Sequence, residues 1–196
     1  MNRLSREFFE RPTLEAARNL LGKVFVDHRK HTLSGRIVEV EAYIGQDDPA
    51  CHARFGKTER NAVMFGPGGF TYVYFIYGMY DMLNFVTEPE GNPAAVLIRA
   101  LEPLEGLKYM KKNRGTDKIE NLTNGPGKLC RAFGLTTAQS GFDLIRGKLF
   151  VADDGYKIEQ ITDSPRIGIK EGTKRHWRFY IHGNKFVSKV YDRKTV

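Results

Sequence analysis

The alternation of hydrophobic and polar positions predicts a helix and two strands near the start of the chain. The helix covers 13–21, with Thr13 as the expected N-cap and Gly22 as the stop. Strands are predicted at 23–26 and 36–44, joined by a polar hairpin connection. The chain is therefore expected to begin with a helix that leads into an antiparallel pair of strands.

The second strand carries two carboxylates on one face. Ile37, Glu39, Glu41 and Tyr43 share this face because successive side chains alternate along a strand. Carboxylates two residues apart lie about 7 Å from each other, which suits a pair flanking a bond, or one general base with a structural neighbour. An outward, solvated strand face is the competing interpretation. Tyr43, and the loop with His52 that follows, favour a site.

Strands, loops and turns alternate over the middle of the chain. A long polar loop covers 45–69, a length that is functional or disordered in most domains. After it, 70–85 is aromatic and rich in strand-forming residues, with a turn at Tyr77-Gly78. A short apolar strand is predicted at 94–100.

Two further helices and a group of short strands complete the prediction. Pro103 is expected to open a helix that ends at Lys112, and a second helix covers 126–133. The remaining strands are predicted at 144–150, 166–169, 178–181 and 186–190. Together these elements predict a mixed α/β (α+β) fold: one compact domain over residues 1–196 with a curved, mostly antiparallel sheet and flanking helices.

The net charge favours an anionic partner. The chain has 31 Lys and Arg against 23 Asp and Glu, which gives +8 and a pI near 9.5. Such a field favours DNA, RNA or an anionic membrane surface, although charge also serves solubility alone. The two cysteines have no CxxC spacing, and the sequence contains no signal peptide and no membrane-spanning apolar run. We expect a cytoplasmic protein, nucleoid-associated if the source is bacterial.

The long loop is rich in residue types that contact phosphates. Arg54, Lys57 and Arg60 are the candidates for DNA backbone contacts. His52 could contact a base edge or titrate near neutral pH. A lone histidine beside a cysteine is a poor metal ligand set, so no metal site is expected.

Six aromatic residues lie between positions 70 and 80. Such residues usually form core, which is the expectation for Phe75. Tyrosines next to basic loops can also stack on bases, and one at the tip of a turn can wedge between them. Arg99 ends an apolar strand and needs an anionic partner, either Glu41 or a phosphate. Lys128, in Gly-Pro-Gly-Lys, either faces a phosphate at a helix N-terminus or belongs to a plain turn.

Taken in order, these segments resemble the alkyladenine (3-methyladenine) DNA glycosylase family. The likeness extends over residues 4–190, with Asn84 and seven runs that match: VEVEAY (38–43), TERNAVMF (58–65), YVYFIYGMY (72–80), LIRALEP (97–103), GPGKL (125–129), PRIG (165–168) and RFY (178–180). The resemblance implies a single domain with a protruding β-hairpin, which binds double-stranded DNA from the minor-groove side as a monomer without a metal or organic cofactor.

The resemblance also implies roles for individual residues. Tyr77 would fill the gap left by a flipped nucleotide. Tyr43, His52 and Tyr74 would hold the extruded base between aromatic rings. Asn84 would exclude guanine by a clash with its 2-amino group.

The implied catalytic pair is Glu41, as the base that activates water, and Arg99, as the partner that holds the carboxylate and the water. The implied reaction is hydrolysis of the N-glycosidic bond of 3-methyladenine, with 7-methylguanine, hypoxanthine and ethenoadenine as further candidate substrates. Two alternatives stay open: a glycoside hydrolase that uses Glu39 and Glu41 as its carboxylate pair, and a non-catalytic DNA- or RNA-binding module.

Overall fold

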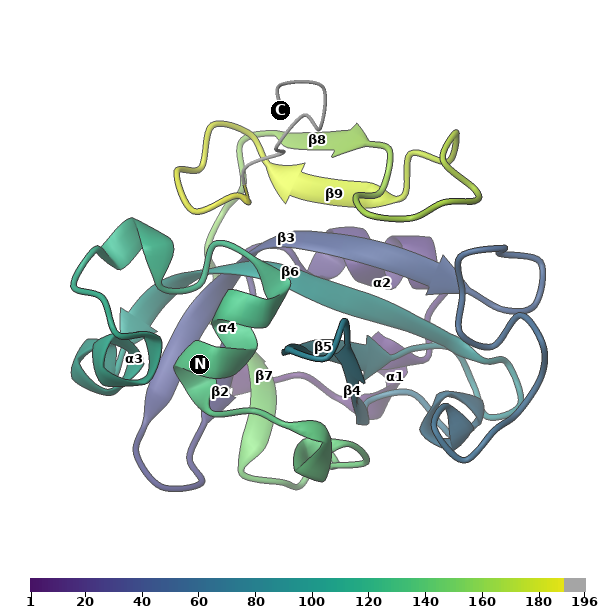
Figure 1. Cartoon of the computed structure of the whole chain (residues 1–196), viewed down its shortest axis with the longest axis horizontal. Coiled ribbons are helices and arrows are strands. Elements are labelled where there is room, and N and C mark those ends of the chain that lie inside the picture. Colours follow the sequence, from purple (N-terminus) through teal and green to yellow (C-terminus); the bar gives the residue numbers. More distant parts are fainter. Residues whose placement is uncertain (189–196) are drawn as a thin grey trace.

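An open sheet of nine strands organises the part of the chain that the computed structural model describes, residues 1–188 (Figure 1). Every strand pair is antiparallel, in the order β1-β7-β2-β3-β6-β5-β4, and β9 joins β3 to β8. The strands are β1 (Asn2–Arg3), β2 (Val24–Asp27), β3 (Leu33–Ile44), β4 (Thr71–Ile76), β5 (Tyr80–Val86), β6 (Ala94–Glu105), β7 (Leu149–Asp153), β8 (Ile161–Ser164) and β9 (Arg178–Ile181). The predicted α+β fold with a mostly antiparallel sheet is confirmed.

Helices cover both faces of this sheet. They are α1 (Arg6–Phe9), α2 (Thr13–Leu20), α3 (Leu107–Arg114) and α4 (Pro126–Phe133). Figure 1 shows α2 behind β3 and α4 in front of β6. The predicted helix at 126–133 is confirmed, and Gly134 ends it with a φ of 61°, in the left-handed region that favours glycine.

The two long central strands, β3 and β6, carry a change of register where the charged residues lie. Glu39 pairs with Ala100, and the next residue, Val40, pairs with Ile98, so Arg99 has no residue opposite it. An extra residue of this kind is a β-bulge, which redirects a side chain relative to the regular alternation. The bulge explains how Arg99 approaches the carboxylates of the neighbouring strand.

A small second core anchors the long loop. Cys51, Ala53 and Met64 pack against Tyr72 of β4 and Val86 of β5. Burial of these side chains gives a loop with little regular structure a fixed position beside the hairpin.

Several predicted elements are wrong or displaced. Pro103 does not open a helix, because β6 continues to Glu105 and pairs with β3 there; the helix begins at Leu107 after Gly106, whose φ is 81°. Thr13 is the first residue of its helix rather than the cap, and its hydroxyl donates to Glu88.

The C-terminal strands are also shifted. The strand expected at 144–150 is β7 at Leu149–Asp153, and 166–169 is not a strand. Strand 178–181 is confirmed as β9. Of the strand expected at 186–190, residues 186 and 187 form a turn and a bend, 188 is not in a strand, and 189–190 lie outside the described residues.

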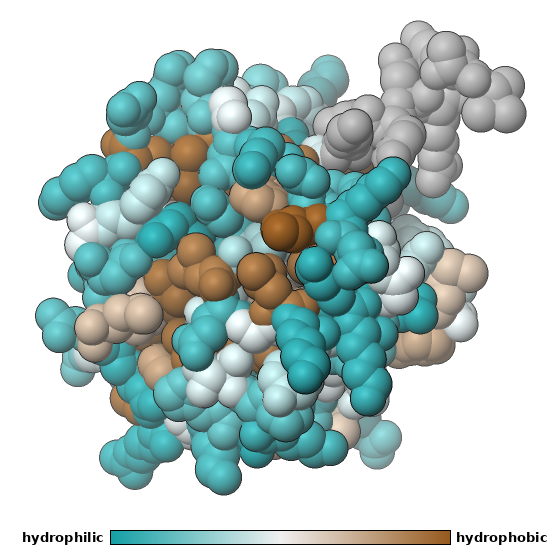
Figure 2. Space-filling model, turned by 90° about the vertical axis from the view of Figure 1, so that its left-hand side faces the viewer, coloured by the Kyte–Doolittle hydropathy of each residue, from teal (hydrophilic) through white to brown (hydrophobic). Residues whose placement is uncertain are grey.

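Hydrophilic residues cover most of the side of the molecule that carries α3, with a few apolar residues between them (Figure 2). The exposed Leu104, Tyr109 and Ile119 come from α3 and its neighbours. Within residues 1–188, no helix is both long enough and apolar enough to cross a bilayer.

Candidate active site

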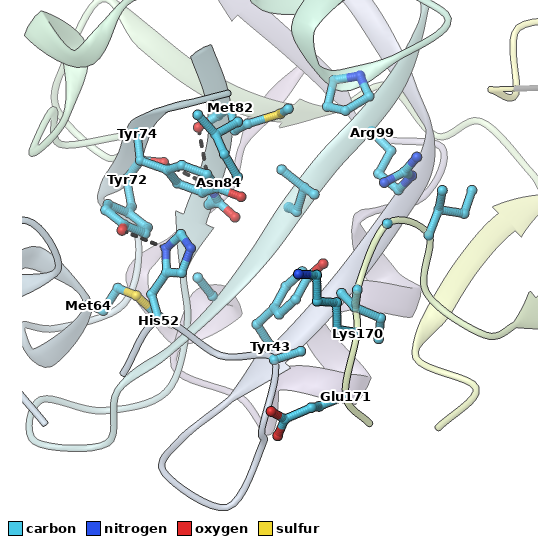
Figure 3. A pocket seen from close by; sticks show the side chains of 18 of the residues that line it. Tyr43, His52, Met64, Tyr72, Tyr74, Met82, Asn84, Arg99, Lys170 and Glu171 are labelled. Carbon is cyan, nitrogen blue, oxygen red and sulfur yellow. Dashed lines mark hydrogen bonds between the residues drawn. The ribbon is translucent and has the colours of Figure 1, made fainter. Parts of the chain in front are cut away.

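A cavity of about 390 Å³ lies between the β4–β5 hairpin, β3, β6 and the segment after β8. Figure 3 shows Tyr72, Tyr74, His52 and Asn84 on one side of it and Tyr43 on the other. A volume of this order accommodates a purine base, and the aromatic walls can cover both of its faces. The structure thus brings together the four residues that the sequence suggested for a base pocket: Tyr43, His52, Tyr74 and Asn84.

The aromatic side of the cavity is a connected cluster. The His52 and Tyr74 rings meet edge-on with centroids 4.4 Å apart, and the Tyr72 and Tyr74 rings lie 5.4 Å apart. His52 Nδ1 and the Tyr72 hydroxyl are hydrogen-bonded at 2.9 Å. This bond fixes the orientation of the imidazole at the cavity wall.

The aromatic groups on the cavity wall, His52, Tyr43 and Tyr74, are uncharged near neutral pH. Burial, together with the charge of Arg60, lowers the pKa of His52 from 6.5 to about 4. Burial raises the pKa of Tyr43 and of Tyr74 above the ordinary value for a tyrosine, and the charge of Glu41 adds to both shifts. A neutral, π-rich wall of this kind suits a flat cationic ligand.

Glu41 lies directly behind the cavity wall. Its carboxylate is fully buried and does not itself line the cavity, but three groups that do line it hold it in place. The Tyr43 hydroxyl donates to Oε2 at 2.8 Å, the backbone N–H of Ile167 donates to Oε1 at 2.7 Å, and Arg99 Nη1 lies 3.2 Å from Oε1. The ion pair with Arg99 is the one that the sequence proposed as an alternative to a phosphate.

Glu39, two residues earlier on β3, is fully buried as well. Burial acts to raise its pKa, but the charges of Arg99 and Arg178 and the bonds to its oxygens outweigh that effect, so the pKa lies below the usual value. The interpretation of this strand face as outward and solvated is wrong, because Glu39 and Glu41 are both fully buried and bond to groups from other parts of the chain.

A buried ion pair holds the segment that supplies the Ile167 N–H. Both nitrogens Nη1 and Nη2 of Arg166 bond to the Asp48 carboxylate, at 2.5 and 2.7 Å, and both side chains are inaccessible to solvent. Arg166 Nη1 also donates to the carbonyl of Ala42, between Glu41 and Tyr43 in β3. The pair therefore ties the long loop and the Ile167 segment to the carboxylate strand.

The tip of the β4–β5 hairpin presents Tyr77 to solvent at the mouth of the cavity. The Tyr77 side chain is 70% exposed, and its φ of 56° and that of Gly78, 68°, suit both central positions of a type I′ turn. The predicted turn at Tyr77-Gly78 is confirmed. Tyr77 also borders a second hollow of about 490 Å³ beside the start of α4.

Asn84 is fixed from two sides. Its Nδ2 donates to the carbonyl of Tyr72 at 3.0 Å and to that of Met82 at 3.2 Å. The amide is 3% exposed and forms part of the cavity wall, so a ligand meets it in a defined orientation.

The four basic residues suggested for DNA backbone contacts make contacts within the protein. Arg54 is paired with Glu171, and Arg60 Nη2 donates to the carbonyl of Phe75 at 3.1 Å. The Lys57 ammonium lies 6.0 Å from the centre of the Phe65 ring. Lys128 Nζ donates to Asn124 Oδ1 at 2.8 Å, near the start of α4. Their contacts with DNA stay a prediction.

Sequence reasoning did not identify several residues of the site: Asp48, Tyr72, Met82, Arg166 and Ile167. Arg166 and Ile167 were within a run that supported the family resemblance, which was their only signal. Groups of three or more His, Cys, Asp or Glu side chains placed to hold a metal ion do not occur among residues 1–188.

Comparisons with known proteins identify a family and relatives that this chain resembles. Residues 7–185 match the sequence model of a family described as Methylpurine-DNA glycosylase (MPG). Proteins named "Putative 3-methyladenine DNA glycosylase" are similar over nearly the whole chain. The one from Prosthecochloris aestuarii is 49% identical over 97% of this chain and 93% of its own length. The one from Methanocella arvoryzae is 50% identical over 95% of this chain and 96% of its own length.

Proposed function

Because the chain belongs to the methylpurine-DNA glycosylase family, we propose that it removes alkylated purines, 3-methyladenine foremost, from double-stranded DNA by hydrolysis. The protein is a DNA glycosylase, a hydrolase of N-glycosyl bonds that acts in base excision repair. The observation that carries the specific proposal is the aromatic cavity with a buried carboxylate held behind its wall.

The cavity supports binding of an extruded base. A base in a duplex is out of reach of the carboxylate, so the nucleotide must leave the stack, at a cost of a few kcal/mol that is least for a damaged pair. Tyr77, which is exposed at the tip of the hairpin, would fill the gap in the stack. The base would lie between Tyr43 and the cluster of His52 and Tyr74, where neutral rings favour a cationic alkylated purine.

Glu41 would act as the general base. A water molecule attacks C1′ of the deoxyribose while the N-glycosidic bond breaks, and the electron pair of that bond leaves with the purine. The water proton passes to Glu41, the cationic 3-methyladenine leaves as a neutral base, and an abasic sugar remains. General base catalysis of this kind contributes about 10²–10⁴-fold. Arg99 and the Tyr43 hydroxyl hold the Glu41 carboxylate in position for this step.

The same features support proposals on the range of substrates and on the way in which the protein binds DNA. We propose that 7-methylguanine, hypoxanthine and ethenoadenine are further substrates, with Asn84 excluding unmodified guanine at the wall. We also propose binding as a monomer from the minor-groove side, with Arg54, Lys57, Arg60 and Lys128 contacting phosphates.

The alternative of a glycoside hydrolase is disfavoured by Glu39. An acid and base pair needs one protonated carboxyl group next to the substrate. Glu39 does not line the cavity, and two arginine side chains hold it as an anion. The pair therefore lacks its acid.

Release of free base from methylated duplex DNA tests the proposed function. We expect the protein to release 3-methyladenine and leave an intact strand with an abasic site, because no amine nucleophile takes part. Binding of the same DNA without release would reduce the protein to a DNA-binding module, and cleavage of oligosaccharides would favour the glycoside hydrolase.

A further inference from the structure

Glu39 is a buried carboxylate that the proposed reaction does not use. Four donors reach it: Arg99 Nε at 2.9 Å and Arg178 Nε at 2.7 Å, and the backbone N–H and the hydroxyl of Ser188 at 2.6 and 2.8 Å. Burying a charge is costly, so such a site persists only when its partners satisfy it. Of the residues that bond to Glu39, only Arg99 lines the cavity, so a contribution of Glu39 to the reaction passes through Arg99.

Arg99 bridges the two carboxylates. Its Nε bonds to Glu39, and its Nη1 lies 3.2 Å from Glu41. A guanidinium group is planar and rigid, so the Nε bond to Glu39 fixes where Nη1 lies relative to Glu41. The bulge in β6 brings the Arg99 side chain to this position.

The charges of this group balance. Glu39 and Glu41 carry two negative charges, and Arg99 and Arg178 carry two positive charges. Arg178 is fixed by a second bond, from Nη1 to the hydroxyl of Ser164 at 2.9 Å. Without Arg178, Glu39 would attract Arg99 more strongly, and without Glu39, Arg99 would be paired with Glu41 alone.

We propose that Glu39 and Arg178 are positioning residues that divide the positive charge of Arg99 between the two carboxylates and thereby set the pH range in which Glu41 acts as a base. The inference rests on the proposed role of Glu41. It assigns opposite effects to the two residues: loss of Glu39 makes Glu41 a weaker base, and loss of Arg178 makes it a stronger base that protonates at higher pH.

The other charged or titratable groups near Glu41 are retained in the variants that test this proposal. Charged or titratable side chains that act on Glu41 come from its own strand, from β4, from β6 and from the segment after β8: Tyr43, Tyr74, Arg99 and Arg166. Because neither variant removes them, a change in the pH profile reports the charge balance at Glu39.

The test is the pH profile of single-turnover base release from methylated duplex DNA. The acidic limb is the part of this profile in which the rate falls as the pH decreases. For Glu39→Gln we expect the acidic limb to move to lower pH by about one unit and the plateau rate to fall about tenfold. For Arg178→Gln we expect the limb to move up by about one pH unit. The double variant, which removes one charge of each sign, should return the limb to the wild-type position.

The matched control is Arg36→Gln. Arg36 is also a nearly buried arginine in a two-bond ion pair, with Asp154, but it lies outside the cavity. Its loss should lower the melting temperature and leave the acidic limb unchanged. If Arg178→Gln does not fold, Ser188→Ala carries the test, because it removes one donor from Glu39 and should move the limb upward by about 0.3 pH units.

Two outcomes separate failure of the inference from failure of the proposed function. Limbs that stay in place, or that move in the same direction in Glu39→Gln and Arg178→Gln, overturn the inference, provided that Glu41→Gln is inactive. If Ser188→Ala has to replace Arg178→Gln, an acidic limb that does not move in Ser188→Ala also overturns the inference. Full base release by Glu41→Gln overturns the role of Glu41 itself.

Discussion

The carboxylate layer of β3 and the tip of the β4–β5 hairpin border the same cavity, but their environments differ. Glu41 is fully buried, and donors from β3, β6 and the Ile167 segment hold it. Tyr77 and Met79 at the tip are 70% and 64% exposed, and Tyr77 has a left-handed backbone. One region is fixed by its partners, and the other leaves apolar surface without a partner in the protein.

This difference follows from what each region has to do. A general base must keep its position and charge, which a network of fixed donors provides. A wedge must enter another molecule, so it has to be exposed, and its apolar surface and backbone conformation reduce the stability of the free protein. The following changes test whether the interior serves stability and chemistry while the tip serves DNA.

The largest effect on stability is expected from Asp48→Ala. It leaves the Arg166 charge buried without its partner, which should lower the free energy of unfolding by about 3–5 kcal/mol in a denaturant titration. As the control, Arg54→Ala removes the more exposed pair with Glu171 and should cost less than about 1 kcal/mol. Equal losses from the two variants would contradict the distinction between interior and rim.

Changes at Tyr77 should weaken DNA binding without lowering the stability of the protein. Tyr77→Ala is expected to weaken binding to a lesion-containing duplex about 10–100-fold, since stacking on a base is worth about 1–3 kcal/mol. Tyr77→Gly should weaken binding as much and raise the free energy of unfolding by about 1 kcal/mol, because glycine adopts this φ without strain. Tyr109→Ala, on α3, is the control and should leave binding unchanged. Wild-type affinity in both Tyr77 variants would remove the wedge from the account.

Asn84→Ser should alter specificity rather than rate. The shorter side chain leaves room at the wall for a 2-amino group, so we expect the preference for alkylated adenine over guanine to fall about tenfold. A competition between DNA that contains alkylated adenine and unmodified DNA, in which the released adenine-derived base and released guanine are both quantified, measures this ratio. An unchanged ratio would show that another part of the wall excludes guanine.

A pH-dependent change in stability is expected from the titration of His52. The pKa is about 4 in the folded protein against 6.5 in the unfolded chain, so the unfolded chain binds a proton first as the pH falls. The free energy of unfolding should therefore decrease between about pH 6.5 and pH 4. The variant His52→Gln should lose this contribution, which a comparison of its stability with that of the wild type over this window measures. Parallel curves would show that His52 does not change its charge there.

Local signals predicted the parts of the fold that depend on local physics. The turn at Tyr77-Gly78 and the helix closed by Gly134 are examples, because their residues suit the backbone angles found there. Pro103 misled the prediction because strand pairing with Gly35, far away in sequence, decides its conformation. Proline suits a helix start but also a strand at an irregularity.

As with the fold, the sequence indicated the parts of the site that depend on local patterns and missed those that depend on distant contacts. The strand pattern placed Glu39, Glu41 and Tyr43 together, and the need of Arg99 for an anion suggested Glu41. The pair of Asp48 with Arg166 spans 118 positions in the sequence, so no local pattern could indicate it. The burial of Glu39 was missed for the same reason, since Arg178 and Ser188 reach it from the other end of the chain.

Base release and lesion binding by Glu41→Gln, measured side by side under single-turnover conditions, test the central claim most directly. The substitution keeps the shape of the side chain and removes its charge. We predict binding to a lesion-containing duplex close to that of the wild type, with release of 3-methyladenine slowed about 10²–10⁴-fold. Release at the wild-type rate would contradict the account, because the carboxylate behind the aromatic wall would then not be the base.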